Sequence, residues 1–197
     1  MAQLENVGEG MIIVKYVKKG SIILGLESSS ESYLKIRNSY LNGELSELLG
    51  FTVSDLQIQP SLTQWFQGMF TQGWQSAEEL LTPQQLTPVF FAEEAKRAKQ
   101  INLQIDLITH SVILLMNISR ENEAEITVNL QVFSAIESNN LPPNLKLKVL
   151  SEGETFGEVT ARNNDRFIQY EFEAEQGDEF TIVLQLGEAI VTEDFVV

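Results

Sequence analysis

The sequence predicts an α+β protein in three parts: a small β-β-α-β unit over residues 1–59, a helical connector over 60–100 and an antiparallel β-sandwich over 101–197. The prediction depends on the spacing of apolar residues, which changes twice along the chain. The first part has short β-rich runs around a helical pattern, and the middle part has apolar residues every three to four positions, as in an amphipathic helix. In the last part apolar residues alternate with polar ones, as in half-buried strands. A chain of 197 residues that is 43% hydrophobic can bury one large core or two small ones.

The N-terminal unit contains two β-rich runs, residues 11–17 and 22–26, separated by a Lys-Lys-Gly-Ser sequence that is typical of a hairpin. Ser28 followed by Glu31 predicts a capped helix, and residues 51–58 predict a returning strand. A unit this small buries little surface, so we expect it to need a partner or a second copy. The apolar helix face supplies the candidate partner-binding residues Tyr33, Tyr40, Leu45 and Leu48.

The connector begins with a predicted helix over residues 62–81, capped by Ser61. Its apolar stripe contains both tryptophans of the chain, and it suits either a core helix or a helix that binds a partner. The candidate partner-binding residues on the stripe are Trp65, Phe66, Phe70 and Trp74.

The rest of the connector, residues 82–100, is the predicted linker. Pro83 ends the preceding helix, and the charged, alanine-rich residues 91–100 predict a short exposed helix. If the linker is accessible to a protease, Lys96, Arg97 and Lys99 are the basic cleavage positions.

The C-terminal part predicts seven or eight short strands. Apolar and polar residues alternate over 101–107, 126–132 and 168–173, whereas residues 112–118 form a nearly continuous apolar run. Such strands, each buried on one face, predict an antiparallel sandwich. Phe167 is the one aromatic residue here that does not fit a core position.

The acidic charge of the chain is concentrated in this part. Residues 100–197 carry 5 basic and 17 acidic groups, out of a net charge of −15. This charge disfavours binding to nucleic acid or to anionic membranes. It suits either a solvated surface or an acidic face for a basic partner.

The sequence favours binding over catalysis. It has no Cys, a single His and no nucleotide-binding motif, so we assign no catalytic, cofactor or metal residue and expect no enzyme. His110 is predicted to be a turn residue, and the acidic clusters are rich in Glu and lack a calcium-loop pattern. With no long apolar run and no secretory signal, we expect a cytoplasmic protein that is not inserted in a membrane.

Residues 65–197 carry a series of short motifs in a fixed order: Gly73-Trp74-Gln75, Leu141-Pro142-Pro143, Leu145-Lys146-Leu147, Ala161-Arg162, Ile168-Gln169, Gly177-Asp178-Glu179-Phe180 and Val191-Thr192-Glu193-Asp194-Phe195. This series resembles an uncharacterised family of photosynthetic bacteria that is known only as a domain of unknown function. Members are encoded near sigma factors and caspase-like proteases, so the resemblance implies a role in signalling or defence.

Lys19-Gly20-Ser21-Ile22-Ile23-Leu24 and the later run Gly43-Glu44-Leu45-Ser46-Glu47-Leu48-Leu49-Gly50 are similar to small effector-associated domains of bacterial conflict proteins. Such domains are adaptors that recruit one protein to another through contacts between like domains. This resemblance implies a protein partner, such as a caspase-like protease or another effector with a matching domain, or self-association into a homo-oligomer.

Three functions therefore follow from the sequence. The first is a non-enzymatic adaptor or regulatory protein, and the second is a substrate that a caspase-like protease cleaves within residues 82–100. The third is a sandwich that binds a ligand such as a carbohydrate.

Overall fold

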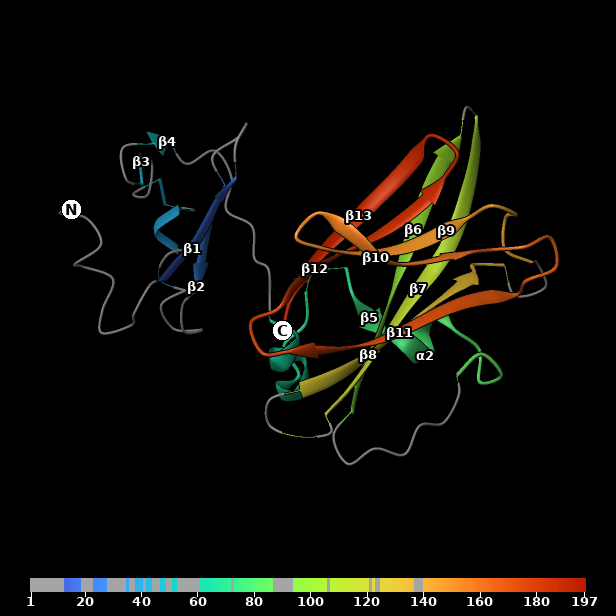
Figure 1. Ribbon diagram of the computed structural model, residues 1–197, viewed down its shortest axis with the longest axis horizontal. Helices are drawn as coiled ribbons and strands as arrows, with labels where there is room; N and C mark the ends of the chain where they lie inside the picture. Colours follow the sequence, from blue (N-terminus) through green and yellow to red (C-terminus); the bar gives the residue numbers. More distant parts are fainter. Residues whose placement is uncertain are drawn as a thin grey trace. The chain divides into compact units, whose positions relative to one another are not determined.

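The computed structural model describes residues 13–18, 23–27, 35, 38–40, 42–43, 47–48, 51–52, 61–71, 73–86, 94–105, 107–120, 122, 125–136 and 140–197 (Figure 1). The chain forms two compact units, Met1–Ile58 (unit 1) and Gln59–Val197 (unit 2), and each is described by itself. The described residues form mostly antiparallel β-sheets with a few short helices.

Unit 1 contains two antiparallel strand pairs. β1 (Ile13–Lys18) pairs with β2 (Ile23–Glu27), which confirms the predicted hairpin, and a register shift between Val14 and Tyr16 marks a bulge. Lys35 and residues 38–40 are helical. β3 (Glu47–Leu48) pairs with β4 (Phe51–Thr52), so the prediction that Leu48 continues the helix is wrong. The pairing of Leu48 with Phe51 leaves a Leu-Gly dipeptide between the strands, and glycine is common in such connections.

Unit 2 contains a five-stranded sheet built around a long hairpin. Its strand order is β11-β8-β7-β6-β5, and all neighbours are antiparallel. Figure 1 shows the β6–β7 hairpin running along this sheet. The strands are β5 (Gln75–Ser76), β6 (Glu94–Ile105), β7 (Ile108–Arg120), β8 (Glu125–Ser134) and β11 (Phe167–Glu175).

The second sheet of unit 2 has four strands in the order β10-β9-β12-β13, again antiparallel. Its strands are β9 (Lys146–Ser151), β10 (Glu154–Thr160), β12 (Glu179–Leu186) and β13 (Ala189–Val196). At its edge, Gly157 of β10 packs so closely on the ring of Tyr170 of β11 that a β-carbon at Gly157 would overlap it. Glycine is therefore required at this contact between the two sheets.

Both sheets contribute side chains to one hydrophobic core. Alternate residues of β8, β9 and β12 point into it, as the sequence predicts. β7 is buried on both faces, because Met116 packs in this core whereas Ile113 and Leu115 pack in a second cluster with Ala77 and Leu81. Burial on both faces explains the nearly continuous apolar run over residues 112–118, which only Asn117 interrupts.

The predicted long helix over residues 62–81 is wrong. The structure has a 3-10 helix, η1 (Leu62–Gln67), then β5, and then a single helical turn, α2 (Ala77–Leu80). η1 ends at Gly68, whose φ of 78° lies in the left-handed region and whose N–H caps the carbonyls of Gln64 and Trp65. Glycine adopts this conformation without strain, so it ends the helix before the apolar stripe is complete.

The predicted charged helix over residues 91–100 is also wrong, because residues 94–100 form the first half of β6. β6 pairs with β7 along its full length, from Glu94 with Ser119 to Ile105 with Ile108. Alanine, lysine and arginine favour a helix locally. Pairing with the buried strand β7 outweighs that preference.

Candidate functional site

The predicted partner-binding residues of unit 1 are only partly described. Tyr40 is helical and half-buried, and Leu48 lies in β3. Tyr33 and Leu45 lie outside the described residues. Their role in binding a partner stays a prediction.

The predicted aromatic residues of the connector gather in the core of unit 2. Trp65 is 1% exposed and Trp74 is 6% exposed, and their ring centroids lie 5.2 Å apart. Phe195 of β13 packs edge-on against both rings, at 6.2 Å and 5.7 Å. The two indoles therefore join η1 to the four-stranded sheet, which favours the core interpretation that the sequence left open.

Phe66 and Phe70 lie at the margin of this aromatic core and are half-buried. The Arg97 guanidinium carbon lies 3.5 Å from the ring centroid of Phe70, and that of Arg120 lies 4.6 Å from the ring of Phe66. These stacks fix both phenyl rings to the five-stranded sheet.

The three candidate cleavage residues, Lys96, Arg97 and Lys99 (the β6 cations), lie within strand β6 rather than in a linker. All three are half-buried and pair with β7, and Arg97 also pairs with β5. Lys99 Nζ donates to Glu193 Oε1 of the other sheet at 2.5 Å. A protease needs an extended, unpaired segment, so cleavage here requires local unfolding.

His110 lies within β7, opposite Leu103 of β6, rather than in the predicted turn. Among the residues that the structure describes, no group of three or more His, Cys, Asp or Glu side chains is placed to hold a metal ion. The same part of the chain contains no helix long and apolar enough to cross a membrane.

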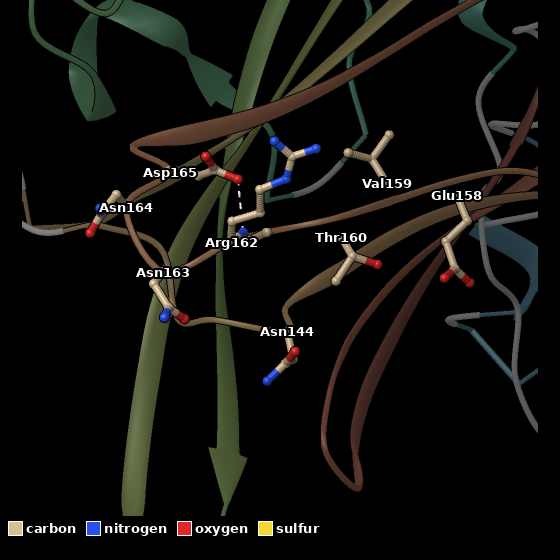
Figure 2. A pocket seen from close by; sticks show the side chains of 9 residues that line it. Asn144, Glu158, Val159, Thr160, Arg162, Asn163, Asn164 and Asp165 are labelled. Atoms are coloured by element: carbon tan, nitrogen blue, oxygen red, sulfur yellow. Dashed lines mark hydrogen bonds between the residues drawn. The ribbon is translucent and has the colours of Figure 1, made fainter.

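Unit 2 has a polar pocket of about 870 Å³ beside β10, lined by Asn144 and residues 158–165 (Figure 2). Asp165 Oδ2 accepts a hydrogen bond from the backbone N–H of Arg162 at 2.8 Å, which closes the turn at one end. At the other end, Lys146 Nζ donates to Glu158 Oε1 at 2.8 Å and lowers the pKa of that carboxyl. The pocket offers amides and ionised groups for binding, and no nucleophile paired with a base lines it.

A polar surface that sequence reasoning missed lies on the outer face of the five-stranded sheet. Strand register places Lys96, Asn117, Asn129 and Glu171 side by side across β6, β7, β8 and β11, and we call these four residues the polar row. Asn129 Nδ2 donates to Glu171 Oε2 at 2.7 Å. Each strand's alternation indicates which residues share a face, but only the register shows that these four are neighbours.

Comparison with known families assigns the larger part of the chain. The family model described as "Protein of unknown function (DUF1822)" matches residues 36–196. The chain belongs to this family. The resemblance to a domain of unknown function is thus confirmed, and the DUF1822 match extends further toward the N-terminus than the motifs indicated. A second model, the TRADD-like N-terminal domain, matches residues 2–58 and overlaps the DUF1822 match over 36–58. No curated protein and no solved structure matches the chain.

Proposed function

We propose that this protein is a non-enzymatic adaptor that mediates protein–protein interaction in the cytoplasm, in bacterial signalling or defence. Unit 1 recruits a partner that carries a matching domain, for which a caspase-like protease or another effector is the candidate. Unit 2 forms an antiparallel sandwich that presents a second surface for binding a protein.

One observation carries the proposal: unit 1 and the TRADD-like match both end at residue 58. A compact unit with its own family match, joined to a larger unit, is typical of a module that works by itself. A domain of this size also buries a smaller fraction of its surface than a large one, which favours association with a partner or a second copy.

The composition of the chain is consistent with binding rather than chemistry. Reactions at neutral pH usually need a thiolate, a titrating imidazole, a metal or a cofactor. The chain has no Cys, and its single histidine lies within a paired strand opposite an apolar residue.

Basic cleavage between residues 94 and 100 is not proposed, because the β6 cations are paired within a sheet. No observation favours cleavage at another position of the predicted linker.

Affinity purification from a native lysate tests the proposal. We expect the full chain to retain a stoichiometric partner, and a chain that lacks residues 1–58 to lose it. The full chain with Glu154→Gln, an exposed change in unit 2, is the matched control and should retain the partner. Where the captured protein is a second copy of the chain, light scattering should show an oligomer that the deletion converts to a monomer. Equal capture by the full and shortened chains would exclude recruitment by unit 1.

A further inference from the structure

The outer face of the five-stranded sheet is divided into an apolar part and a polar part. α2 covers the apolar part, where Ala77 and Leu81 pack on Ala98, Ile113 and Leu115. Two residues from Ala98 on β6 and from Leu115 on β7, the polar row replaces these apolar positions. The outer face therefore changes from core packing to hydrogen-bonding groups within one step of the strand repeat.

Asn117 is the unusual member of the polar row. Its side chain lies on the central strand β7 and is only 8% exposed, yet its Oδ1 accepts no hydrogen bond. No donor among the described residues lies within hydrogen-bond distance of this oxygen, and the amide of the neighbouring Asn129 donates to Glu171 instead. A buried acceptor without a donor is costly in a folded protein. The carbonyl oxygen of Asn117 is therefore an unpaired acceptor with almost no accessible surface, so a donor from another molecule reaches it only by displacing a neighbouring side chain.

The edge strand β11, which β8 separates from Asn117, is acidic. Glu171, Glu173 and Glu175 occupy successive outward positions of β11, and all three are exposed. None of the outward-facing residues that the structure describes on β7, β8 and β11 is basic. The acidic row is thus complementary to a cationic molecule.

An exposed aromatic ring lies at the end of the same strand. Phe167 is 47% exposed and stacks on Phe133 of β8 with ring centroids 5.5 Å apart. One face of an exposed phenyl ring can accept an ammonium or guanidinium group. Outward side chains of β11 follow one another at about 6.8 Å, which is also the spacing of alternate side chains in an extended peptide.

We propose that this face binds an extended, positively charged segment of a partner protein. Its cationic side chains pair with Glu171 and Glu173, one N–H donor reaches Asn117 Oδ1, and the ring of Phe167 receives a further cation. The carboxylates favour this ligand over a neutral carbohydrate, because a neutral ligand leaves the repulsion among them unrelieved. Binding here involves unit 2 alone and does not depend on recruitment by unit 1.

The test measures fluorescence anisotropy of a labelled ten-residue peptide with alternating arginine and threonine, titrated with the full chain. The double variant Glu171→Gln, Glu173→Gln removes two exposed charges and should weaken binding about fivefold, as two exposed ion pairs do. The matched variant Glu154→Gln, Glu188→Gln removes two exposed charges from the four-stranded sheet and should change binding by less than about twofold.

A third variant, Asn117→Leu, separates binding from stability. It removes the buried acceptor, so it should raise the melting temperature while it weakens peptide binding. Three results would overturn the proposal: equal binding by the two double variants, binding of the peptide by Asn117→Leu as tightly as by the wild type, or preference for a glutamate–threonine peptide or a cellulose hexasaccharide. Because the glutamate changes lie on the surface, the test remains decisive where Asn117→Leu does not fold.

Discussion

Replacing Phe195 with alanine should destabilise unit 2 by about 4 kcal/mol. Phe195 is 2% exposed, and its ring packs against Trp65, Trp74 and Phe180, the last with a centroid distance of 5.5 Å. The prediction tests whether the tryptophans of η1 and the following turn are held in a core.

The magnitude follows from what the substitution removes. Loss of a buried ring costs about 2–3 kcal/mol in apolar transfer, and ring pairs contribute about 0.5–1.5 kcal/mol each beyond the buried area. The cavity left between the two sheets is included in the range of about 3–5 kcal/mol for such substitutions. For a unit of this size, 4 kcal/mol corresponds to a decrease in melting temperature of about 12 °C.

Tryptophan fluorescence during urea or thermal unfolding measures the effect, because both tryptophans of the chain lie in this cluster. The control is Ile190→Ala, at a residue that is 57% exposed, and it should change stability by less than about 0.5 kcal/mol. A loss below about 1 kcal/mol for Phe195→Ala would refute the core assignment and restore the tryptophans as candidates for a partner surface.

Three further predictions concern unit 2. Trypsin should cut the native chain at Arg162 and Arg166, which lie in an exposed turn, before it cuts at the β6 cations, which are paired in a sheet. Mass spectrometry of the early fragments measures the order of cleavage, and the reverse order would contradict the pairing of β6. Gly157→Ala should lower the free energy of unfolding in urea by about 1–3 kcal/mol, because the new methyl group displaces the ring of Tyr170. The same substitution made in a Tyr170→Ala background should cost less, and an equally large loss there would show that the clash with Tyr170 is not the cause. The lowered pKa of Glu158 means that its ion pair stabilises the fold above the ordinary glutamate pKa of about 4.3 and is lost as the pH falls through the lowered value. Glu158→Gln should therefore flatten the decrease in urea midpoint below about pH 4, and an unchanged profile would contradict this.

Three strands of unit 2, β8, β9 and β12, could be predicted from the sequence because each carries its own alternating period. Residues of β8, β9 and β12 alternate between core and solvent, which is a local signal. The order of strands in the two sheets is not local, because it depends on contacts between residues far apart in the chain.

The errors of prediction have specific physical causes. Residues 94–100 prefer a helix by composition, but pairing with β7 makes them a strand. The stripe over 62–81 has a helical period by coincidence, because Gly68 ends η1 and Trp74 reaches the same core from outside any helix. A helical spacing of apolar residues therefore does not show that all of them belong to a single helix.

The candidate binding face could be predicted only in part. The acidic charge of the C-terminal part and the unusual position of Phe167 were evident from the sequence. The unsatisfied acceptor of Asn117 could not be predicted from the sequence. It depends on the contacts that the neighbouring side chains make in the folded sheet, such as the hydrogen bond from Asn129 to Glu171 and the ion pair of Lys96 with Glu94.

The most direct test of the proposed adaptor function is the dissociation constant of the captured partner for the full chain and for residues 59–197. Unit 2 keeps its own hydrophobic core in the shortened chain, and Trp fluorescence verifies that it is folded. We predict that removal of unit 1 weakens binding at least about a hundredfold, as loss of a primary binding module does. An unchanged dissociation constant would contradict recruitment by unit 1.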